Sequence, residues 1–379
     1  MPRILIAPLN WGLGHATRSL PIGRALQAAD SSLEIHWASD GAALALLRKE
    51  LPASATIHQL PGADIRYPTR SATINMALAT PRLVKLWRAE AAAVSALQEQ
   101  YSFDAIVSDN RFGCRIEGVP SVVVTHQAHL PIAGLSGRIG NEFNQQLLRR
   151  FDAMVIPDYP PPHGLAGPMS APLPGVPTSY LGPVSRFVEE RTSNLISEPQ
   201  STNAQWKIAA VLSGPEPQRT ILEEMILEQL LTDRAFSSMH SDILVVRGLP
   251  VVAKSSALVE EARKAGISVV DFLDAAELRP VLAKADLLVV RPGYTTVMDL
   301  AALGRKAVFI PTPAQPEQAW LGQRLADLGR GVCYQQRGLV LAKAFKSMAV
   351  LPSTQGKQPV ERPHSALAAW ATSFVSGLR

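Results

Sequence analysis

The segment from Val289 to Pro311, VVRPGYTTVMDLAALGRKAVFIP, combines residue types that can hold a phosphorylated ligand. The turn Arg291-Pro292-Gly293 stands between an expected apolar strand and an expected helix over Thr295–Leu303. Such a turn gathers backbone N–H groups at the positive end of the helix dipole, which attracts phosphate or diphosphate. Asp299 follows Thr296 by three residues, so both lie on about one helix face, where a carboxylate can accept hydrogen bonds from vicinal hydroxyls. We interpret the segment as a nucleotide site, and an ordinary strand–helix–strand unit is the alternative.

A second glycine-rich turn, Gly12-Leu13-Gly14-His15-Ala16-Thr17-Arg18, follows a strand expected at the N-terminus. The glycines Gly12 and Gly14 let the backbone approach a ligand and leave the start of the next helix uncovered. His15 stands at that helix start, where a general base is useful because imidazole titrates near neutral pH. A histidine that only caps the helix is the alternative.

Polar residues also follow two apolar strands of the first half. Asp109 comes after the strand expected over Ala105–Ser108, and His126, Gln127 and His129 come at the end of the next apolar run. Residues just beyond the carboxyl ends of strands face the ligand crevice of an open α/β sheet. Asp109 and His126 are therefore further candidates for the base, and a purely structural role stays open for both and for His129.

Two more turns in the second half can bind polar ligands. Ser213-Gly214 ends an expected strand and leads into a helix, an arrangement that suits a phosphate. Arg219 can add a bidentate contact, although an exposed helix arginine is the simpler interpretation. Glu317 and Gln318 follow Pro311 at a helix start, where an acidic residue is common without any ligand.

The elements that position these residues alternate between strand and helix. In the first half, strands are expected over Ile4–Ala7, Leu33–Ala38, Thr56–Gln59, Ala105–Ser108, Ser121–Thr125 and Ala153–Ile156. Helices are expected over Thr17–Ala29, Ala42–Lys49, Ile74–Gln100 and Arg138–Arg150, the third with a kink or restart at Pro81. The alternation predicts parallel βαβ units with right-handed crossovers.

The second half repeats the alternation after a proline-rich stretch at 157–177, which has the composition of a linker. Strands are expected over Lys207–Leu212, Ile243–Val246, Ser268–Asp271, Asp286–Val290, Ala307–Ile310 and Val332–Tyr334, then a loop over Ser353–Pro363 and a helix over Ser365–Ser376. The predicted fold class is α/β, with two doubly wound, Rossmann-like domains facing a cleft. We place the domains at residues 1–157 and 204–350, with a linker region at 158–203 and a tail and helix at 351–379.

Length and composition fit this division. A chain of 379 residues with 47% hydrophobic and 18% charged residues suits two globular domains. The net charge of +5 comes without a Lys/Arg block, so a nucleic-acid partner is not expected, and an anionic substrate or a membrane surface fits equally well. Two distant cysteines, no signal-peptide pattern and no long apolar run predict a cytoplasmic protein with free thiols.

The segment around Asp299 resembles the nucleotide-sugar signature of glycosyltransferase family 28, the MurG-type N-acetylglucosaminyl transferases. That pattern runs Arg-Ser-Gly-x-x-Thr-x-x-Glu, followed by a glycine and a strand that closes on proline. The positions in register here are Arg291, Gly293, Thr296, Gly304 and Pro311, with Asp299 in place of the glutamate that holds the ribose. The resemblance implies the GT-B fold and a nucleotide-sugar donor bound by the second domain.

Other loops of the family align in order along the chain. The loop at His15 is similar to the first glycine-rich loop of MurG-type enzymes, although Asn10 and Trp11 stand where two glycines would be. It is more similar to the GxGHxxR loop of the nucleotide-sugar hydrolase in pseudaminic acid synthesis. The loop from His126 is similar to their acceptor loop, with Gln127 in place of a glutamate.

For the donor, the resemblance assigns several residues of the second half. It implies that the turns at Gly214 and Gly293 bind the diphosphate, with Ser213 and Arg291 in the same nucleotide-sugar site, and that Glu317 and Gln318 bind the sugar. Pro215 removes one backbone donor that the family would offer. The segment Gly182–Arg186 loosely resembles a hinge segment of the family, which makes Arg186 a further diphosphate candidate.

The hypothesis that follows is a glycosyltransferase that moves a hexose or N-acetylhexosamine from a nucleotide diphosphate sugar to a hydroxyl of a saccharide or lipid-linked acceptor. The resemblance implies a UDP-linked donor. Inversion of configuration, no cofactor and no metal are expected, with His15, His126 or Asp109 as the base and Gly12, Gly14, Gln127 and His129 on the acceptor side. A nucleotide-sugar hydrolase or epimerase and a non-catalytic binding protein are the alternatives. The apolar and basic helix over residues 76–88 suits either peripheral contact with the inner face of a membrane or ordinary packing in the domain.

Overall fold

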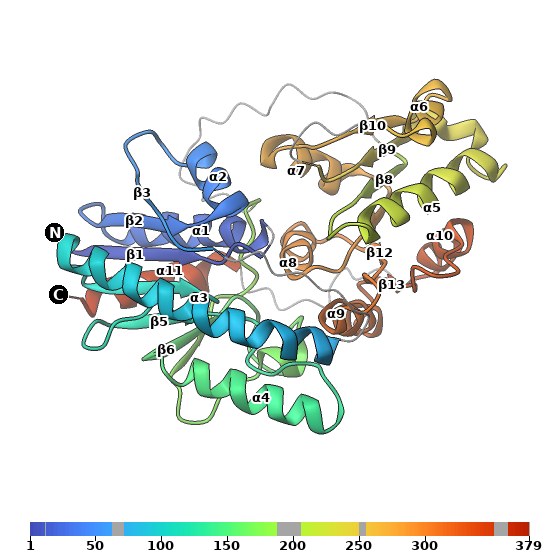
Figure 1. Ribbon diagram of the computed structural model, residues 1–379. Coiled ribbons are helices and arrows are strands. Elements are labelled where there is room, and N and C mark those ends of the chain that lie inside the picture. Colours follow the sequence, from blue (N-terminus) through green and yellow to red (C-terminus); the bar gives the residue numbers. More distant parts are fainter. Residues whose placement is uncertain (12, 63–71, 188–205, 250–254, 352–362, 379) are drawn as a thin grey trace. The chain divides into compact units, whose positions relative to one another are not determined.

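The computed structural model describes residues 1–11, 13–62, 72–187, 206–249, 255–351 and 363–378 (Figure 1). The chain divides into two compact units. The N-terminal unit comprises Met1–Val188 and also Val360–Arg379, and the C-terminal unit comprises Glu189–Pro359. The two units are described separately.

The N-terminal unit is built on a parallel sheet with the strand order β3-β2-β1-β4-β5-β6-β7. Its strands are β1 (Arg3–Pro8), β2 (Glu34–Ser39), β3 (Thr56–Gln59), β4 (Ala105–Asp109), β5 (Ser121–Val124), β6 (Ala153–Ile156) and β7 (Thr178–Tyr180). The helices that accompany it are α1 (Gly14–Ala29), α2 (Gly41–Glu50), α3 (Ala72–Tyr101), α4 (Gly134–Leu148), α11 (Pro363–Ser376) and the short 3₁₀ turn η1 (Gly167–Ser170).

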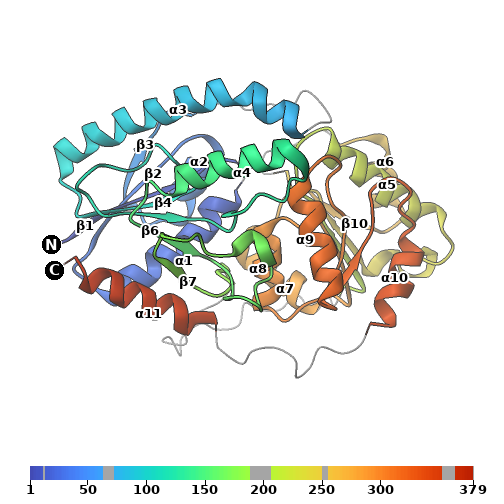
Figure 2. The same cartoon turned by 90° about the horizontal axis from the view of Figure 1, so that it is seen from below.

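Helices cover both faces of this sheet, and strand β1 shows why. Ile4 and Ile6 belong to a core cluster with residues of α1, α2 and α11, whereas Leu5 and Ala7 pack with residues of α3. Successive side chains of a strand point to opposite faces, so a strand that is apolar at every position needs a cover on each side. Figure 2 shows α11 beside α1 on one face and α3 with α4 on the other.

The C-terminal unit has a parallel sheet of its own, in the order β10-β9-β8-β11-β12-β13. Its strands are β8 (Ile208–Val211), β9 (Ile243–Val246), β10 (Ser268–Val270), β11 (Leu287–Val290), β12 (Ala307–Phe309) and β13 (Gly331–Cys333). Its helices are α5 (Gln218–Thr232), α6 (Ala257–Lys264), α7 (Ala275–Lys284), α8 (Tyr294–Ala302), α9 (Pro316–Asp327) and α10 (Leu341–Ala349), with a 3₁₀ turn η2 (Ser237–Asp242). Two doubly wound parallel sheets confirm the predicted α/β fold class.

The linker predicted at 158–203 is wrong for the residues that the structure describes. Strand β7 pairs with β6 in parallel, so the chain beyond Pro157 completes the N-terminal sheet. The Asp158 carboxylate, which is fully buried, accepts hydrogen bonds from the backbone N–H groups of Tyr159, Leu165 and Ala166. The prolines therefore shape an ordered loop around this carboxylate. Residues 189–203 lie outside the described part of the chain.

The C-terminal helix also belongs elsewhere than expected. Leu367, Ala371 and Val375 of α11 are buried in the core cluster of the N-terminal unit. The tail predicted as a separate region after the second domain is thus an element of the first. The loop expected over Ser353–Pro363 falls almost wholly outside the described residues.

The helix with the proposed membrane face is a continuous helix, α3, with Pro81 inside it. Its Leu83 and Leu86 are buried, whereas Arg82, Lys85 and Arg88 are exposed. Among the described residues of this segment, the pattern is therefore that of ordinary packing, with the charges in water.

Candidate active site

His15 and Asp109 meet at the carboxyl ends of two adjacent strands. In the register of β1 and β4, Pro8 pairs with Asp109, and the Leu9 N–H donates to the Asp109 carbonyl oxygen at 3.1 Å. The loop after β1 leads into α1, whose second residue is His15. The imidazole Nδ1 of His15 lies 2.8 Å from Oδ1 of Asp109.

Arg18 completes the cluster one helical turn beyond His15. Its Nε donates to Oδ2 of Asp109 at 2.7 Å, and its Nη2 donates to Oδ1. The Ser19 hydroxyl adds a longer hydrogen bond to Oδ2 at 3.3 Å. Residues three apart on a helix are neighbours, so the GHxxR spacing places His15 and Arg18 against the same carboxylate.

The electrostatics of this cluster fix the charge of Asp109, which is fully buried. Burial alone raises the pKa of its carboxyl, but the charges of Arg18 and His15 and their hydrogen bonds outweigh burial and hold the pKa well below its ordinary value. The Asp109 carboxylate therefore stays charged near neutral pH and is placed to orient His15. His15, whose side chain is 14% exposed, stays a candidate for the base.

Of the other predicted residues of this unit, His126 joins the cluster and His129 does not. The Nδ1 of His126 lies 3.2 Å from Nη1 of Arg18. The Nδ1 of His129 contacts the side-chain amide of Gln145 on α4 at 3.2 Å, and the carbonyl oxygen of Gln127 accepts from Asn144 at 2.9 Å. These two contacts anchor the loop after β5 to α4.

The structure describes only one of the two glycines predicted in the first loop. Gly14 begins α1, and Gly12 lies outside the described residues. Arg18 was part of the recognised GxGHxxR pattern but was not predicted as a site residue. The signal that could have found it is its spacing of three from His15 in a helix that follows a buried strand.

In the C-terminal unit, the start of α8 has the form expected of an anion site. The N-cap residue Gly293 has no side chain that could cap the helix. The space where a Cβ would stand is open, with no atom within 4 Å of that position. The first N–H groups of the helix therefore have open space beside the cap. Thr296 is half-buried in the first turn, and Asp299 is 2% exposed in the second.

Arg291 does not have the place of a diphosphate ligand. Its side chain is 1% exposed, and Nη1 donates to the carbonyl oxygens of Ile310 and Pro311, each at 3.0 Å. Nη2 donates to the carbonyl oxygen of Gln218 at 2.9 Å and to Oε1 of Gln336 at 2.6 Å. The prediction of direct contact is corrected because these acceptors use both terminal nitrogens to tie together the loops after β11, β12 and β13.

The charge of Arg291 nevertheless bears on the site. Its four recorded acceptors are neutral oxygens, its Nε has no partner, and burial lowers its pKa to about 10. A buried cation without a carboxylate among these partners raises the local positive potential. Arg291 adjoins the turn at Gly293, so it favours an anion there through its field.

The turn at Ser213-Gly214 is exposed, and Gly214 has a φ of +112°, which a residue with a Cβ rarely adopts. Arg219 differs from both expectations for it. It is 4% exposed, and it donates to Glu216 through Nε at 2.5 Å and to Glu223 through Nη1 at 2.7 Å. The exposed helix arginine is therefore wrong, and the diphosphate contact is corrected because these two carboxylates already bind the guanidinium.

The remaining residues predicted to bind the sugar donor lie in different surroundings. Gln318 uses Oε1 to accept from the backbone N–H of Thr312 at 2.8 Å, and Glu317 is half-buried in the first turn of α9. Arg186 belongs to the N-terminal unit, and its guanidinium lies 4.8 Å from the ring centre of Phe187. Sugar or diphosphate contacts by these three residues stay predictions.

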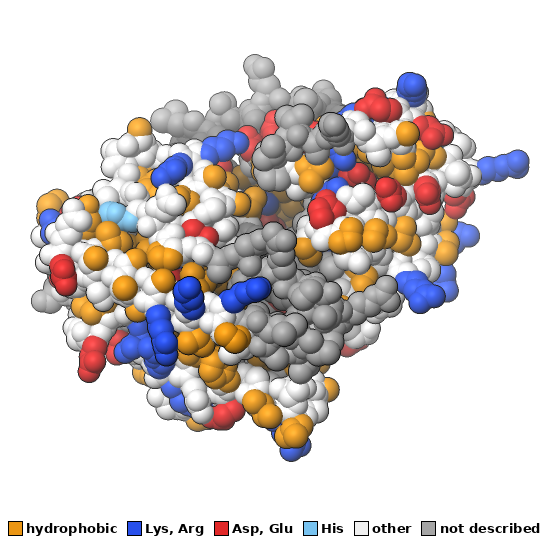
Figure 3. All heavy atoms as spheres, viewed as in Figure 1, with side chains coloured by type: hydrophobic (Ala, Val, Ile, Leu, Met, Phe, Trp, Pro, Cys, Tyr) orange, Lys and Arg blue, Asp and Glu red, His pale blue; other side chains and the backbone are white. Residues whose placement is uncertain are grey.

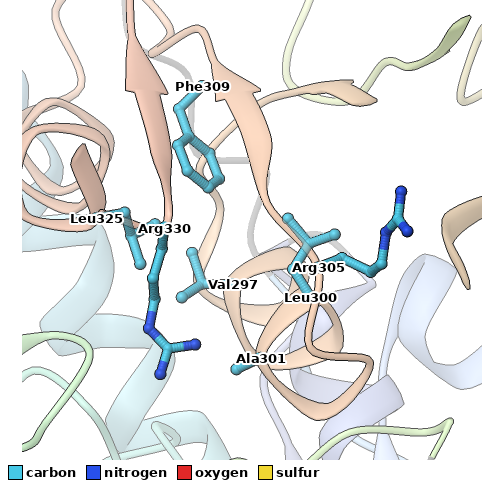
Figure 4. A pocket seen from close by; sticks show the side chains of 7 residues that line it. All are labelled: Val297, Leu300, Ala301, Arg305, Phe309, Leu325 and Arg330. Carbon is cyan, nitrogen blue, oxygen red and sulfur yellow. The ribbon is translucent and has the colours of Figure 1, made fainter. Parts of the chain in front are cut away.

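A small cavity of the C-terminal unit is lined in part by side chains of α8 (Figure 4). It has an empty volume of about 180 Å³, part of which is open solvent. Its lining residues are Val297, Leu300, Ala301, Arg305, Phe309, Leu325 and Arg330. None of the predicted donor residues lines it, so we do not assign the donor to this cavity.

Two other kinds of feature are absent from the described residues. No group of three or more His, Cys, Asp or Glu side chains there could hold a metal ion. No described helix is both long and apolar enough to cross a membrane.

Comparison with known proteins finds glycosyltransferases that resemble this chain. Residues 226–359 match the model of the glycosyltransferase family 28 C-terminal domain. A UDP-N-acetylglucosamine–N-acetylmuramyl-(pentapeptide) pyrophosphoryl-undecaprenol N-acetylglucosamine transferase of Bifidobacterium adolescentis is 24% identical over 345 residues, which cover 84% of this chain and 81% of that protein. The chain is a glycosyltransferase that is similar to the MurG-type enzymes. The homologous enzyme of Mannheimia succiniciproducens is 34% identical over 115 residues, but this match spans only 32% of that enzyme and 29% of this chain.

Solved structures agree on the fold of this glycosyltransferase. The crystal structure of the glycotransferase of kitacinnamycin superposes with a TM-score of 0.71 over 100% of both chains, at 15% sequence identity. At that identity, the likeness establishes a shared GT-B fold and carries no information about the substrate.

Proposed function

We propose that this glycosyltransferase moves a sugar from a nucleotide diphosphate sugar to a hydroxyl acceptor, with His15 as the general base. The observation that carries the proposal is the hydrogen bond between Nδ1 of His15 and the buried carboxylate of Asp109. This contact orients the imidazole and stabilises the cation that forms when Nε2 takes a proton. Deprotonation of the acceptor hydroxyl makes it a nucleophile for the anomeric carbon, and attack opposite the leaving group inverts the configuration.

The C-terminal unit supports the donor half of the proposal. The open N-terminus of α8 at Gly293 and the positive field of Arg291 suit the diphosphate. They would also stabilise the charge that develops on the departing nucleotide diphosphate. Ribose binding by Asp299, sugar binding by Glu317 and Gln318, and transfer without a metal ion belong to the same proposal. The resemblance to MurG-like enzymes favours a UDP-linked donor.

A lipid-linked acceptor would bring the protein to a membrane, and an exposed apolar stripe on α4 supports this part of the proposal. Leu135, Ile139 and Phe143 are 73%, 64% and 41% exposed, and they recur every four residues along the helix. Arg138 is exposed on the same helix. Figure 3 shows hydrophobic side chains with a basic one beside them over the surface where α4 runs. Such a stripe can enter the boundary of a bilayer.

The test begins with thermal shifts and product analysis for UDP-, GDP- and TDP-sugars, with and without a lipid extract. We expect one nucleotide class to stabilise the protein and its sugar to appear on an acceptor, with and without EDTA. The variant His15→Gln should lose about 10²- to 10⁴-fold in turnover while donor binding is kept, because only the base is removed. The matched control is His163→Gln, which changes an exposed histidine of the N-terminal unit outside the cluster and should keep its turnover.

Other outcomes would contradict the proposal. Free sugar released at a rate that no acceptor changes would indicate the hydrolase. The absence of a thermal shift with any nucleotide would contradict the donor site. Full turnover in His15→Gln would place the base on another residue.

A further inference from the structure

Arg18 lies between the two histidines of the N-terminal cluster. The residue is 2% exposed, and its Nε and Nη2 both donate to the carboxylate of Asp109. The third nitrogen, Nη1, lies 3.2 Å from Nδ1 of His126, and Nη2 lies 2.9 Å from Nδ1 of His15. One fixed cation is therefore within hydrogen-bond distance of both rings.

The contact with His126 determines where that ring carries its proton. A guanidinium has only N–H donors and stays charged at any working pH. The Nδ1 of His126 must therefore present its lone pair to Nη1, which leaves the proton of the neutral ring on Nε2. Protonation of His126 would point a second N–H at the guanidinium and place two cations side by side in a buried site.

The contacts of His15 require the opposite arrangement. Its Nδ1 faces Oδ1 of Asp109 at 2.8 Å, and a carboxylate can only accept. Nδ1 must therefore carry the proton, and the lone pair is on Nε2. The N–H groups of His15 and of Arg18 Nη2 converge on the same oxygen, which explains the short distance between the two nitrogens.

We infer that Arg18 is a positioning residue that gives the two histidines opposite tautomers. His15 then has a basic Nε2, whereas His126 is held neutral and can only donate from Nε2. Within the cluster, the charged group that faces His126 is Arg18 from α1. Asp109 from β4 and His15 from α1 lie beyond Arg18. The role of this arrangement in the reaction rests on the proposed function, because it leaves His15 as the one histidine of the pair able to accept a proton.

The tautomers can be measured in the intact, substrate-free protein, so the test does not depend on activity. Long-range ¹H–¹⁵N spectra of protein labelled at its 8 histidines distinguish pyrrole-type from pyridine-type nitrogens, and His15→Gln and His126→Gln assign the two rings. We expect Nδ1 of His126 to be pyridine-type and Nδ1 of His15 to be pyrrole-type at pH 7. A pyrrole-type Nδ1 on His126, or matching tautomers on the two rings, would overturn the inference.

A variant tests the cause. In Arg18→Met, His126 should begin to titrate between about pH 5 and pH 8, the range of an ordinary imidazole, whereas it stays neutral there in the wild type. Arg24→Met is the matched control, since Arg24 is exposed on the same helix and should leave both rings unchanged. If the loss of Arg18 leaves Asp109 unbalanced and the protein does not fold, Arg18→Met with Asp109→Asn removes both charges. An unchanged His126 titration in the folded variant would refute the role of Arg18.

The two proposals can fail separately. Opposite tautomers together with full turnover in His15→Gln would keep this inference and reject the proposed base. Matching tautomers with loss of turnover in His15→Gln would do the reverse.

Discussion

At the scale of single residues, three arginines with similar sequence surroundings take different roles. Arg18 is paired with a buried carboxylate, Arg219 with two glutamates, and Arg291 with four neutral oxygens. Only the last has a buried charge without a carboxylate among its recorded partners. This difference is why we assign a structural role to Arg219 and an electrostatic one to Arg291.

Replacement of Asp109 by Asn should destabilise the protein by about 3–5 kcal/mol at pH 7, because it leaves the buried charge of Arg18 without its partner. Folding lowers the pKa of Asp109. The carboxylate therefore contributes its full stabilisation above the pKa of the unfolded state, which is near 3.8. This stabilisation is lost as the pH falls through the pKa of the folded state. Urea unfolding of wild type and variant should therefore show a constant difference from pH 7 to about pH 5 that shrinks below about pH 4. A difference that grows on acidification would contradict the pairing.

At the scale of elements, the exposed apolar face lies on α4 and not on α3, for which the sequence suggested membrane contact. The large side chains Leu83 and Leu86 of α3 are buried, whereas Leu135, Ile139 and Phe143 of α4 are exposed. Both helices have an apolar face, and only their packing decides which face reaches solvent. The membrane contact proposed above is therefore placed on α4.

The triple variant Leu135→Ser, Ile139→Ser and Phe143→Ser should bind vesicles with anionic lipid at least about tenfold more weakly, because it removes three large apolar side chains from the contact. Its free energy of unfolding should change little, since these residues are exposed. Flotation with vesicles measures the binding. The matched control, Ile221→Ser, Leu328→Ser and Val350→Ser, changes exposed apolar residues of the C-terminal unit and should bind as the wild type does. Equal loss in both variants would contradict a specific role for α4.

At the scale of the whole molecule, the chain crosses from one unit to the other twice. Residues 360–379 return to the N-terminal unit after the C-terminal unit is complete. Leu367 of α11 is 5% exposed within the first core. The stability of the N-terminal unit thus depends on the last residues of the chain.

Leu367→Ala should cost the N-terminal unit about 2–5 kcal/mol, as expected for a cavity in a packed core. Calorimetry in the presence and absence of the nucleotide donor can show which unit loses stability. The donor should raise the unfolding temperature of the C-terminal unit, and the variant should lower the transition that the donor does not shift. Ala369→Ser, on an exposed position of the same helix, is the control. A loss confined to the donor-sensitive transition would contradict the assignment of α11 to the first unit.

The sequence by itself determined most of the elements and the fold class. Strands β3, β6 and β9 have the predicted bounds, because short apolar or β-branched runs between turns have few alternatives. Strand β7 was missed, since Thr178, Ser179 and Tyr180 form a short edge strand that follows a proline and lacks the apolar run of a central strand. The glycine turns at Gly293 and Gly214 could be predicted because their conformation is a local property.

Only the tertiary structure decided which polar side chains meet. His15 and Asp109 are 94 residues apart in sequence, and they form a hydrogen bond because β1 pairs with β4. Arg291 is held by residues 19 to 73 positions away, so its local pattern could not show that its terminal nitrogens are already used. Local conformation follows from neighbouring residues, whereas the partner of a charged group depends on strand order, helix packing and burial, which arise only when distant parts of the chain come together.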